Sequence, residues 1–343
     1  MNRLQRICSS NFLKSKRQFS SRFDQNSALV KVRQYDNKGH FTAQLTDQLS
    51  VANVPNGGLL MAIAISAAKE MITFPEPLTV TGHYVNKALE NKQAEIIVEI
   101  LNVSKSTATV EMKILQEDIL RCTFLGTFGN IAAMRGLQYS DMTAPVLPPV
   151  EECVDVGSLL TKGLGLNVTL FNTVSLRIPK DSSFLTDLVH GRVAKKPSYE
   201  CWSRFSELDR KPCTRSLAFF LDAIPPPVLL IAPTTWVPTL EYTVHFWNAP
   251  NPCPCKRNLP LPIESDSAGV IPKHHAAHAH IHTHNSDAKL GSDWLRLRLT
   301  TPFIRNGLLC ADAEAWSEDG KVLLATAKQM ARVLQPGGSK SHK

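Results

Sequence analysis

The chain has 343 residues, 43% of them hydrophobic, and is therefore long enough to bury two hydrophobic cores. Its formal net charge is +8, but five basic residues and no acid lie in the first 19 positions, so the rest carries 8 − 5 = +3. This small charge argues against a nucleic-acid partner. No uninterrupted apolar run reaches the roughly 20 residues of a membrane-spanning helix, so the sequence predicts no membrane span.

Residues 1–22 are rich in arginine, lysine and serine, and the first acid of the chain is Asp24. This composition is typical of a mitochondrial transit peptide, and a disordered basic tail is the alternative. Arg17-Gln-Phe19 followed by Ser20 resembles a processing site with arginine two positions before the last residue removed. We therefore predict import into the mitochondrial matrix and cleavage near Phe19.

Residues 28–133 are organised around one apolar helix. Asn56-Gly57-Gly58 leads into a segment, ending near Met71, that is apolar on almost every side and must therefore be buried on every side. Four strand-like segments separated by turns follow it: Leu78–Val85, Ala94–Val103, Thr107–Leu115 and Ile119–Phe128. A buried helix followed by an antiparallel meander predicts a sheet curled around that helix.

An internal repeat indicates a second unit over residues 165–335. Thr81-Gly-His-Tyr-Val-Asn86 lines up with Thr243-Val-His-Phe-Trp-Asn248, sharing Thr, His, an aromatic residue and Asn. The second central helix is predicted at about Thr214 to Ala223, because three prolines follow it. A proline-containing linker, residues 134–164, joins the two units.

Residues 249–292 form an insertion in the second unit. It contains Cys253-Pro-Cys255 and six histidines, at positions 274, 275, 278, 280, 282 and 284. Imidazoles at alternate positions can chelate a transition metal, but no carboxylate or cysteine at a fixed spacing completes a ligand set. We therefore predict a solvated loop without a functional metal site, and a disordered tail over residues 336–343.

These segments resemble the double hotdog acyl-CoA thioesterases. The resemblance covers roughly residues 40–335 and is carried by Asn56-Gly-Gly58, Pro77-Leu-Thr-Val80, Gly126-Thr-Phe-Gly129 and Trp236-Val-Pro-Thr-Leu-Glu-Tyr-Thr-Val-His245. It implies an α+β tandem hotdog, in which each unit is a curved antiparallel sheet wrapped around a central helix. It also implies an acyl-CoA substrate, and the sheets could support a homo-oligomer.

No Gly-x-Ser-x-Gly, P-loop or Gly-x-Gly-x-x-Gly motif is present, so the sequence predicts no nucleophile elbow and no cofactor. Thioester hydrolysis needs a carboxylate, a donor to the carbonyl and groups that hold water. Glu241 is the candidate carboxylate because it interrupts an apolar strand; the resembled family usually has aspartate there. The resemblance also implies a water-positioning glutamine at Gln329 and a catalytic hydroxyl at Thr301.

Gly57 and Gly58 are the candidate oxyanion site, because the amides at a helix start can bind developing negative charge. The first repeat has Thr79 and Gly126 where the second has Glu241 and Gln329, so we predict a single active site. Asp222, which precedes the three prolines, is interpreted as structural.

The leading hypothesis is an acyl-CoA thioesterase in which a carboxylate assists water attack on a thioester carbonyl polarised by helix amides. One alternative is a non-catalytic acyl-CoA or acyl-chain binding protein on the same scaffold. Another is an enoyl-CoA hydratase-type enzyme that uses His83 or His245 as its base. Release of free CoA thiol distinguishes the first hypothesis from the other two.

Overall fold

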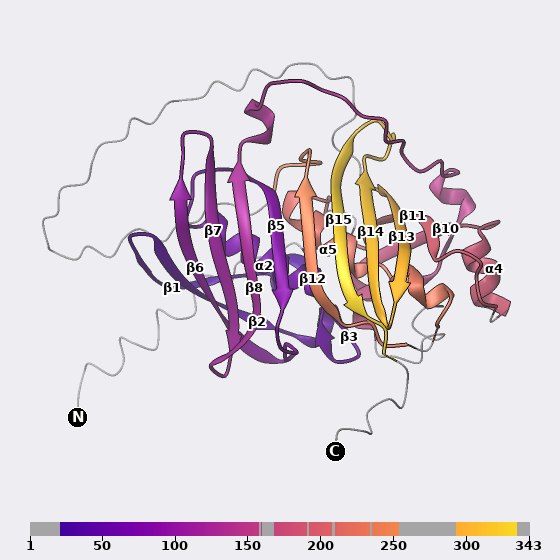
Figure 1. The fold of residues 1–343 in the computed structure, drawn as a ribbon, viewed down its shortest axis with the longest axis horizontal. Coiled ribbons are helices and arrows are strands. Elements are labelled where there is room, and N and C mark those ends of the chain that lie inside the picture. Colours follow the sequence, from indigo (N-terminus) through magenta and orange to yellow (C-terminus); the bar gives the residue numbers. More distant parts are fainter. Residues whose placement is uncertain are drawn as a thin grey trace, which may run out of the picture.

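A computed structural model of the chain describes residues 21–157, 159, 168–190, 192–207, 210–233, 235–253 and 293–334 (Figure 1). The predicted transit peptide up to residue 20, most of the insertion at 249–292 and the tail at 336–343 lie outside the described residues. The six histidines of the insertion are among the residues outside this description.

One antiparallel sheet runs through the whole molecule, in the order β1-β2-β6-β7-β8-β5-β12-β15-β14-β13-β11-β10-β9. The first half supplies β1 (Val30–Tyr35), β2 (Lys38–Leu45), β5 (Glu76–Tyr84), β6 (Lys92–Val103), β7 (Thr107–Gln116) and β8 (Ile119–Gly129). The second half supplies β9 (Cys153–Asp155), β10 (Val174–Pro179), β11 (Ser198–Phe205), β12 (Thr239–Phe246), β13 (Leu295–Arg305), β14 (Leu308–Trp316) and β15 (Leu323–Arg332). A separate small sheet pairs β3 (Ser50–Val51) with β4 (Val54–Pro55).

Two central helices, α2 (Gly57–Lys69) and α5 (Thr214–Ala223), pack against each other behind this sheet (Figure 1). Asn56 caps α2 by accepting the amide hydrogen of Leu59, and nearly every residue of α2 is buried. The predicted helices match these two elements, and the predicted strands of the first half match β5 to β8. The curved sheet around central helices confirms the predicted hotdog fold class.

The two halves of the sheet meet where β5 pairs antiparallel with β12, near the middle of Figure 1. In this pairing Thr81 lies opposite Thr243, and their hydroxyl oxygens are within hydrogen-bonding distance of each other, at 2.9 Å. These two threonines are the equivalent residues of the sequence repeat. The two repeated segments are therefore neighbouring strands in the sheet, and the Thr81–Thr243 pair lies at equivalent positions in both.

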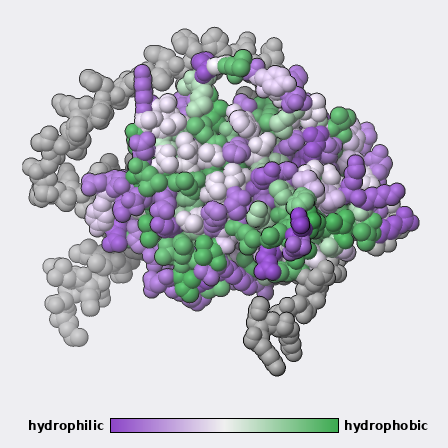
Figure 2. All heavy atoms as spheres, viewed as in Figure 1, coloured by the Kyte–Doolittle hydropathy of each residue, from purple (hydrophilic) through white to green (hydrophobic). Residues whose placement is uncertain are grey.

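The face of the sheet turned away from the helices is a mixture of hydrophilic, intermediate and hydrophobic residues (Figure 2). Along β12, for example, Tyr242 and Val244 are buried against the helices, whereas His245 on the other face is exposed. This alternation is the period-two pattern of a strand with one covered face.

Part of the predicted linker lies against the outer face of the second half. Arg298 donates to the Thr143 carbonyl at 2.9 Å, and Arg296 donates to the Pro145 carbonyl at 3.0 Å. The indole of Trp202 donates to the Pro148 carbonyl at 2.9 Å. The linker is therefore hydrogen-bonded to β11 and β13 between Thr143 and Pro148, and its residues 153–155 join the sheet as β9, beside β10.

The first described helix packs into the core of the second half. Helix α1 (Arg22–Asn26) is capped by Ser21, and Phe23 is fully buried with its ring centroid 5.2 Å from those of both Phe205 and Phe219. A further described helix is α4 (Ser183–His190). In the part of the chain that the structure describes, no helix is long and apolar enough to cross a membrane.

Candidate active site

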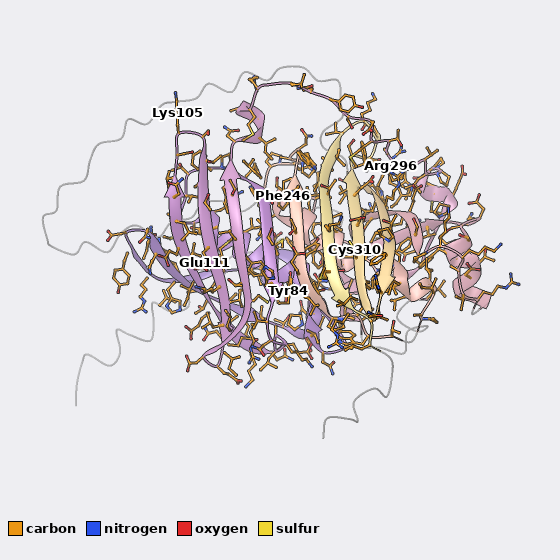
Figure 3. The ribbon with its side chains drawn as sticks, viewed as in Figure 1. Tyr84, Lys105, Glu111, Phe246, Arg296 and Cys310 are labelled. Atoms are coloured by element: carbon orange, nitrogen blue, oxygen red, sulfur yellow. The ribbon has the colours of Figure 1, made fainter. Side chains whose placement is uncertain are left out.

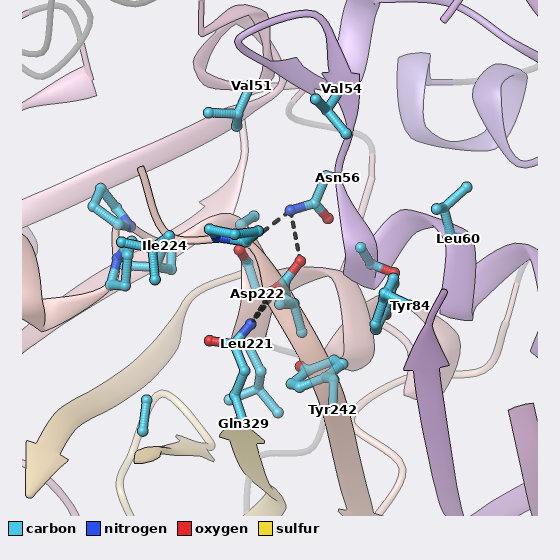
Figure 4. A pocket seen from close by; sticks show the side chains of 18 of the residues that line it. Val51, Val54, Asn56, Leu60, Tyr84, Leu221, Asp222, Ile224, Tyr242 and Gln329 are labelled. Atoms are coloured by element: carbon cyan, nitrogen blue, oxygen red, sulfur yellow. Dashed lines mark hydrogen bonds between the residues drawn. The ribbon is translucent and has the colours of Figure 1, made fainter. Parts of the chain in front are cut away.

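A cavity of about 650 Å³ lies where the start of α2 meets the end of α5 (Figure 4). The turn between β3 and β4, the prolines after α5, and residues of β12 and β15 complete its wall. Most of the lining side chains are apolar, including Val51, Val54, Leu60, Leu221 and Ile224. Its size and lining are those of a typical small-molecule site.

The carboxylate of Asp222 is at the polar end of this cavity. Its Oδ2 accepts hydrogen bonds from the Gly58 amide at 2.8 Å and from Asn56 Nδ2 at 2.9 Å, and its Oδ1 accepts one from Gln329 Nε2 at 3.0 Å. The Gly57 amide also donates to it. The positive end of α2 therefore holds the carboxylate that the last turn of α5 presents.

Burial raises the pKa of Asp222 above its ordinary value, although the hydrogen bonds from Gly58, Gln329 and Asn56 oppose that rise. All of these donors are neutral. The carboxylate is therefore stabilised by dipoles alone, in a hollow that admits a ligand. A buried acid with a raised pKa in a cavity is the arrangement expected of a proton acceptor in catalysis.

Gln329 also contacts the hydroxyl of Thr239, which is not among the site residues predicted from the sequence. Its Nε2 donates to Thr239 Oγ1 at 2.7 Å as well as to Asp222. Both hydrogens of the amide are thereby used, and the Thr239 hydroxyl keeps its own proton to donate. A register shift in β12 between Thr239 and Glu241 turns Thr239 toward the cavity.

Two tyrosines flank the carboxylate. Tyr84 Oη donates to the Gly57 carbonyl at 2.8 Å, and Tyr242 Oη donates to the Ala218 carbonyl at 3.0 Å. Burial, followed by the nearby charge of Asp222, raises the pKa of both phenols well above the usual range. The two tyrosines are therefore hydrogen-bond donors and stay neutral around neutral pH.

Gly58 allows the two helices to approach closely enough to form this site. A Cβ at Gly58 would lie 2.3 Å from the Ala218 carbonyl oxygen and 2.9 Å from the Phe219 Cα. Such distances to backbone atoms cannot be relieved by a side-chain rotation. The glycine therefore brings the amides of α2 within hydrogen-bonding distance of Asp222.

The structure brings three of the five predicted site residues together: Gly57, Gly58 and Gln329. Glu241 is not in this group, because its neighbours in the sheet, His83 and Met330, are on the outer face and it does not line the cavity. Its carboxylate instead accepts a hydrogen bond from Thr243, on the same strand face. We therefore place the candidate carboxylate at Asp222, which the sequence analysis interpreted as structural.

Thr301 is also outside the group. It is buried in β13, its amide donates to the Pro197 carbonyl at 2.8 Å, and it does not line the cavity. His83 and His245, the bases of the hydratase alternative, are exposed and outside the cavity lining. Among the described residues, no three His, Cys, Asp or Glu side chains are grouped so as to hold a metal ion.

The sequence matches the acyl-CoA thioesterase N-terminal domain over residues 45–129, and the acyl-CoA thioesterase C-terminal domain over residues 160–269 and 275–333. These matches cover most of the chain. The chain therefore belongs to the acyl-CoA thioesterase family, whose members are thioester hydrolases, and the resemblance seen in the sequence is confirmed.

Solved structures support the same fold. A Thermobifida fusca protein assigned as a thioesterase II is 21% identical, with a TM-score of 0.69, over 92% of this chain and 98% of that one. A hotdog-fold protein of unknown function from Alicyclobacillus acidocaldarius is 18% identical, with a TM-score of 0.67 and the same coverage. The acyl-CoA thioesterase II TesB2 of Mycobacterium marinum is 13% identical, with a TM-score of 0.57, over 92% and 99%. A comparison with curated proteins gave no significant match.

Proposed function

We propose that this protein hydrolyses acyl-CoA thioesters at the cavity, with Asp222 as the general base. The observation that carries the proposal is the position of Asp222, which is half-buried, held by neutral donors and open to an apolar cavity. Family membership supplies the substrate class, an acyl-CoA thioester. The apolar part of the cavity is the site for the acyl chain.

In the proposed reaction, Asp222 accepts a proton from a water molecule as the water oxygen attacks the thioester carbonyl carbon. The tetrahedral intermediate then collapses, the carbon–sulfur bond breaks, and the CoA sulfur takes the proton back from Asp222. The products are a free acid and CoA with its thiol. No other reactant is needed.

Gln329 and Thr239 have supporting roles in this proposal. The Gln329 amide fixes Asp222 Oδ1 and the Thr239 oxygen, so the Thr239 proton is left to face the thioester oxygen or the attacking water. The amides of Gly57 and Gly58, proposed from the sequence as donors to the oxyanion, are occupied by Asp222 in this structure. Their proposed role is therefore to hold the base.

The test is release of CoA thiol from a series of acyl-CoA substrates of increasing chain length. We expect Asp222→Asn to lower kcat by roughly 10²- to 10⁴-fold with little change in KM, because the amide keeps the shape but cannot take the proton. Glu241→Gln is the matched control and should retain wild-type kcat. A wild type that binds acyl-CoA without releasing thiol would favour the non-catalytic binding protein, and a loss confined to Glu241→Gln would contradict the assignment of Asp222.

We also propose that the protein acts in the mitochondrial matrix, on the composition of residues 1–22. N-terminal sequencing of protein from cells tests this. An intact Met1 on protein recovered from mitochondria would contradict it.

A further inference from the structure

Tyr84 and Asp222 are connected through a single peptide group. The Tyr84 hydroxyl donates to the Gly57 carbonyl oxygen at 2.8 Å, and the Gly58 amide donates to Asp222 Oδ2, also at 2.8 Å. The Gly57 carbonyl and the Gly58 amide are the two ends of the same planar peptide unit. A continuous chain of hydrogen bonds therefore runs from the phenol to the carboxylate.

A hydrogen bond to the carbonyl of a peptide group polarises the group and makes its N–H a stronger donor. In this chain the strengthened donor is the Gly58 amide, and its acceptor is the ionised form of Asp222. The phenol also fixes the plane of the peptide, and so the direction in which the amide points. Both effects favour the ionised carboxylate, which is the form that a general base requires.

We propose that Tyr84 is a positioning residue for the reaction, which holds and polarises the Gly57–Gly58 peptide group that binds the Asp222 carboxylate. The inference rests on the proposed function only in taking Asp222 as the base. Tyr84 itself does not act on the reacting atoms in this proposal.

The surroundings of Tyr84 hold its hydroxyl at this place. Its ring is edge-on to Phe124, with the centroids 5.9 Å apart and an interplanar angle of 90°. Phe124 in turn occupies the space above Gly82, where a Cβ would come within 2.4 Å of its ring. Tyr84 lies near the end of β5, beside the junction with β12 (Figure 3), and its hydroxyl approaches the start of α2 from that strand.

Tyr242 provides a matched control in the same cavity. It too donates its phenol to a helix carbonyl, that of Ala218, at 3.0 Å. The amide at the other end of that peptide group belongs to Phe219, which is inside α5 and does not bind Asp222. Tyr242→Phe therefore removes a buried phenol of the same kind without removing the connection to the carboxylate.

Few of the described titratable groups near Asp222 would titrate in the same pH range and so obscure its pKa. Tyr84 approaches it from β5 and Tyr242 from β12, and both have a pKa well above the usual range for the reasons given above. Cys122 on β8 is close to Tyr84, and burial raises its pKa to about 12. Among the described residues, Lys87 and Asp312 are further charged groups in the cavity lining, and Glu241 acts on Tyr84 from the outer face of the sheet. The described donors to Asp222 from α2 and β15 are neutral.

The experiment is the pH dependence of kcat/KM for wild type, Tyr84→Phe and Tyr242→Phe. Loss of the polarising phenol weakens the bond to ionised Asp222, so its pKa should rise. We expect the acid limb of Tyr84→Phe to move upward by roughly 0.2 to 0.5 pH units, with a lower kcat and an unchanged KM. The acid limb of Tyr242→Phe should coincide with that of the wild type. An unmoved acid limb in Tyr84→Phe, or equal shifts in both variants, would overturn the proposal.

A second readout does not depend on turnover. The Asp222 carboxyl carbon can be titrated by ¹³C NMR in protein with labelled aspartate, with its signal assigned from the one missing in Asp222→Asn. Tyr84→Phe should raise the titration midpoint, and Tyr242→Phe should leave it in place. If the wild type hydrolyses no thioester, the proposed function fails, while this titration still decides whether Tyr84 acts on Asp222.

Discussion

The two ends of the α2–α5 pair bury charge in opposite ways. At one end the start of α2 meets the end of α5, and the Asp222 carboxylate is bound by neutral donors beside a cavity. At the other end Arg215, in the first turn of α5, donates to Ser66 near the end of α2 at 3.1 Å. There, Asp24 of α1 pairs with both Arg210 and Arg215, at 2.8 and 2.7 Å.

The difference separates a chemical role from a structural one. Asp24 of α1 faces two guanidinium groups, and the neighbouring Phe23 is packed into the core. Its charge is compensated, and Asp24 does not line the cavity. Asp222 has no cationic partner among the groups that hydrogen-bond to it in the described structure. A buried carboxylate that is satisfied by dipoles and open to a cavity can exchange a proton with a substrate, whereas one compensated by paired arginines holds elements together.

The largest effect on stability should come from the end of the α2–α5 pair that carries Asp24, Arg210 and Arg215. Asp24→Ala leaves Arg210 and Arg215 buried without their carboxylate, and breaking such a buried pair costs roughly 3 to 5 kcal/mol. We expect a large fall in the free energy of unfolding, measured by urea titration, while kcat per folded molecule stays at the wild-type value.

Glu117→Ala is the control for that experiment. Glu117 pairs with Lys92 at 2.9 Å on the surface, where both side chains are 54% exposed. Surface pairs contribute little, so its removal should leave the urea midpoint almost unchanged. Equal, small losses in both variants would show that the Asp24 cluster does not hold the fold, and a loss of kcat in Asp24→Ala would show that the two ends are coupled.

A variant at Gly58 should affect stability and catalysis together. In Gly58→Ala the new Cβ collides with the Ala218 carbonyl, so α2 and α5 must separate, at a cost of roughly 1 to 3 kcal/mol. The same movement takes the Gly58 amide away from Asp222, so kcat should fall as well. Gly57→Ala is a comparison for stability only: its Cβ would meet side-chain atoms of Tyr84 and Asp222 at 3.0 and 3.1 Å rather than backbone, so it should cost less stability but also disturb the base. A Gly58→Ala enzyme with wild-type stability would contradict the close helix contact.

The smallest expected effect is a pH dependence of stability that comes from Asp222, at the cavity end of the α2–α5 pair. Because burial raises the pKa of Asp222 above 3.8, the group's contribution to stability is fully present below the unfolded-state pKa and is lost as pH rises through the folded-state pKa. Asp222→Asn lacks this titration. We therefore expect the wild type to lose stability relative to the variant as pH rises from acid toward neutral, in urea titrations at several pH values. The opposite sign would mean that hydrogen bonding outweighs burial.

The fold followed from the sequence wherever the pattern was strong. The apolar segment after Gly57 and the helix that ends at Ala223 match α2 and α5. Strands β1 and β2 were not predicted. In β1 the alternation Val30-Lys-Val-Arg33 is only four residues long, and both valines are exposed in the structure, so no buried apolar face marks it as a strand. Its place at the sheet edge depends on pairing with β2.

The candidate site was less predictable. Glu241 is the predicted carboxylate because it is an acid in an apolar strand. The period of the strand, however, places it on the face opposite Tyr242. Choosing between the faces required knowing where the helices pack. The sequence pattern around Asp222 favours a structural role, because an acid followed by prolines is also common at an ordinary helix end. The feature that could have indicated a functional role is that Asp222 is the single charged residue in an otherwise apolar last turn of α5. Only the structure shows that its carboxylate binds the Gly58 amide of α2.

The cluster around Asp24 also sets an order of events during folding. Asp24 is separated from its partners Arg210 and Arg215 by 186 and 191 positions in the sequence. When the chain is made from its N-terminus, Asn26 of α1 can already meet Gln48 of the first half, but Asp24 cannot pair with its two arginines until residue 215 has emerged. Closing so long a loop is slow, so α1 should join late.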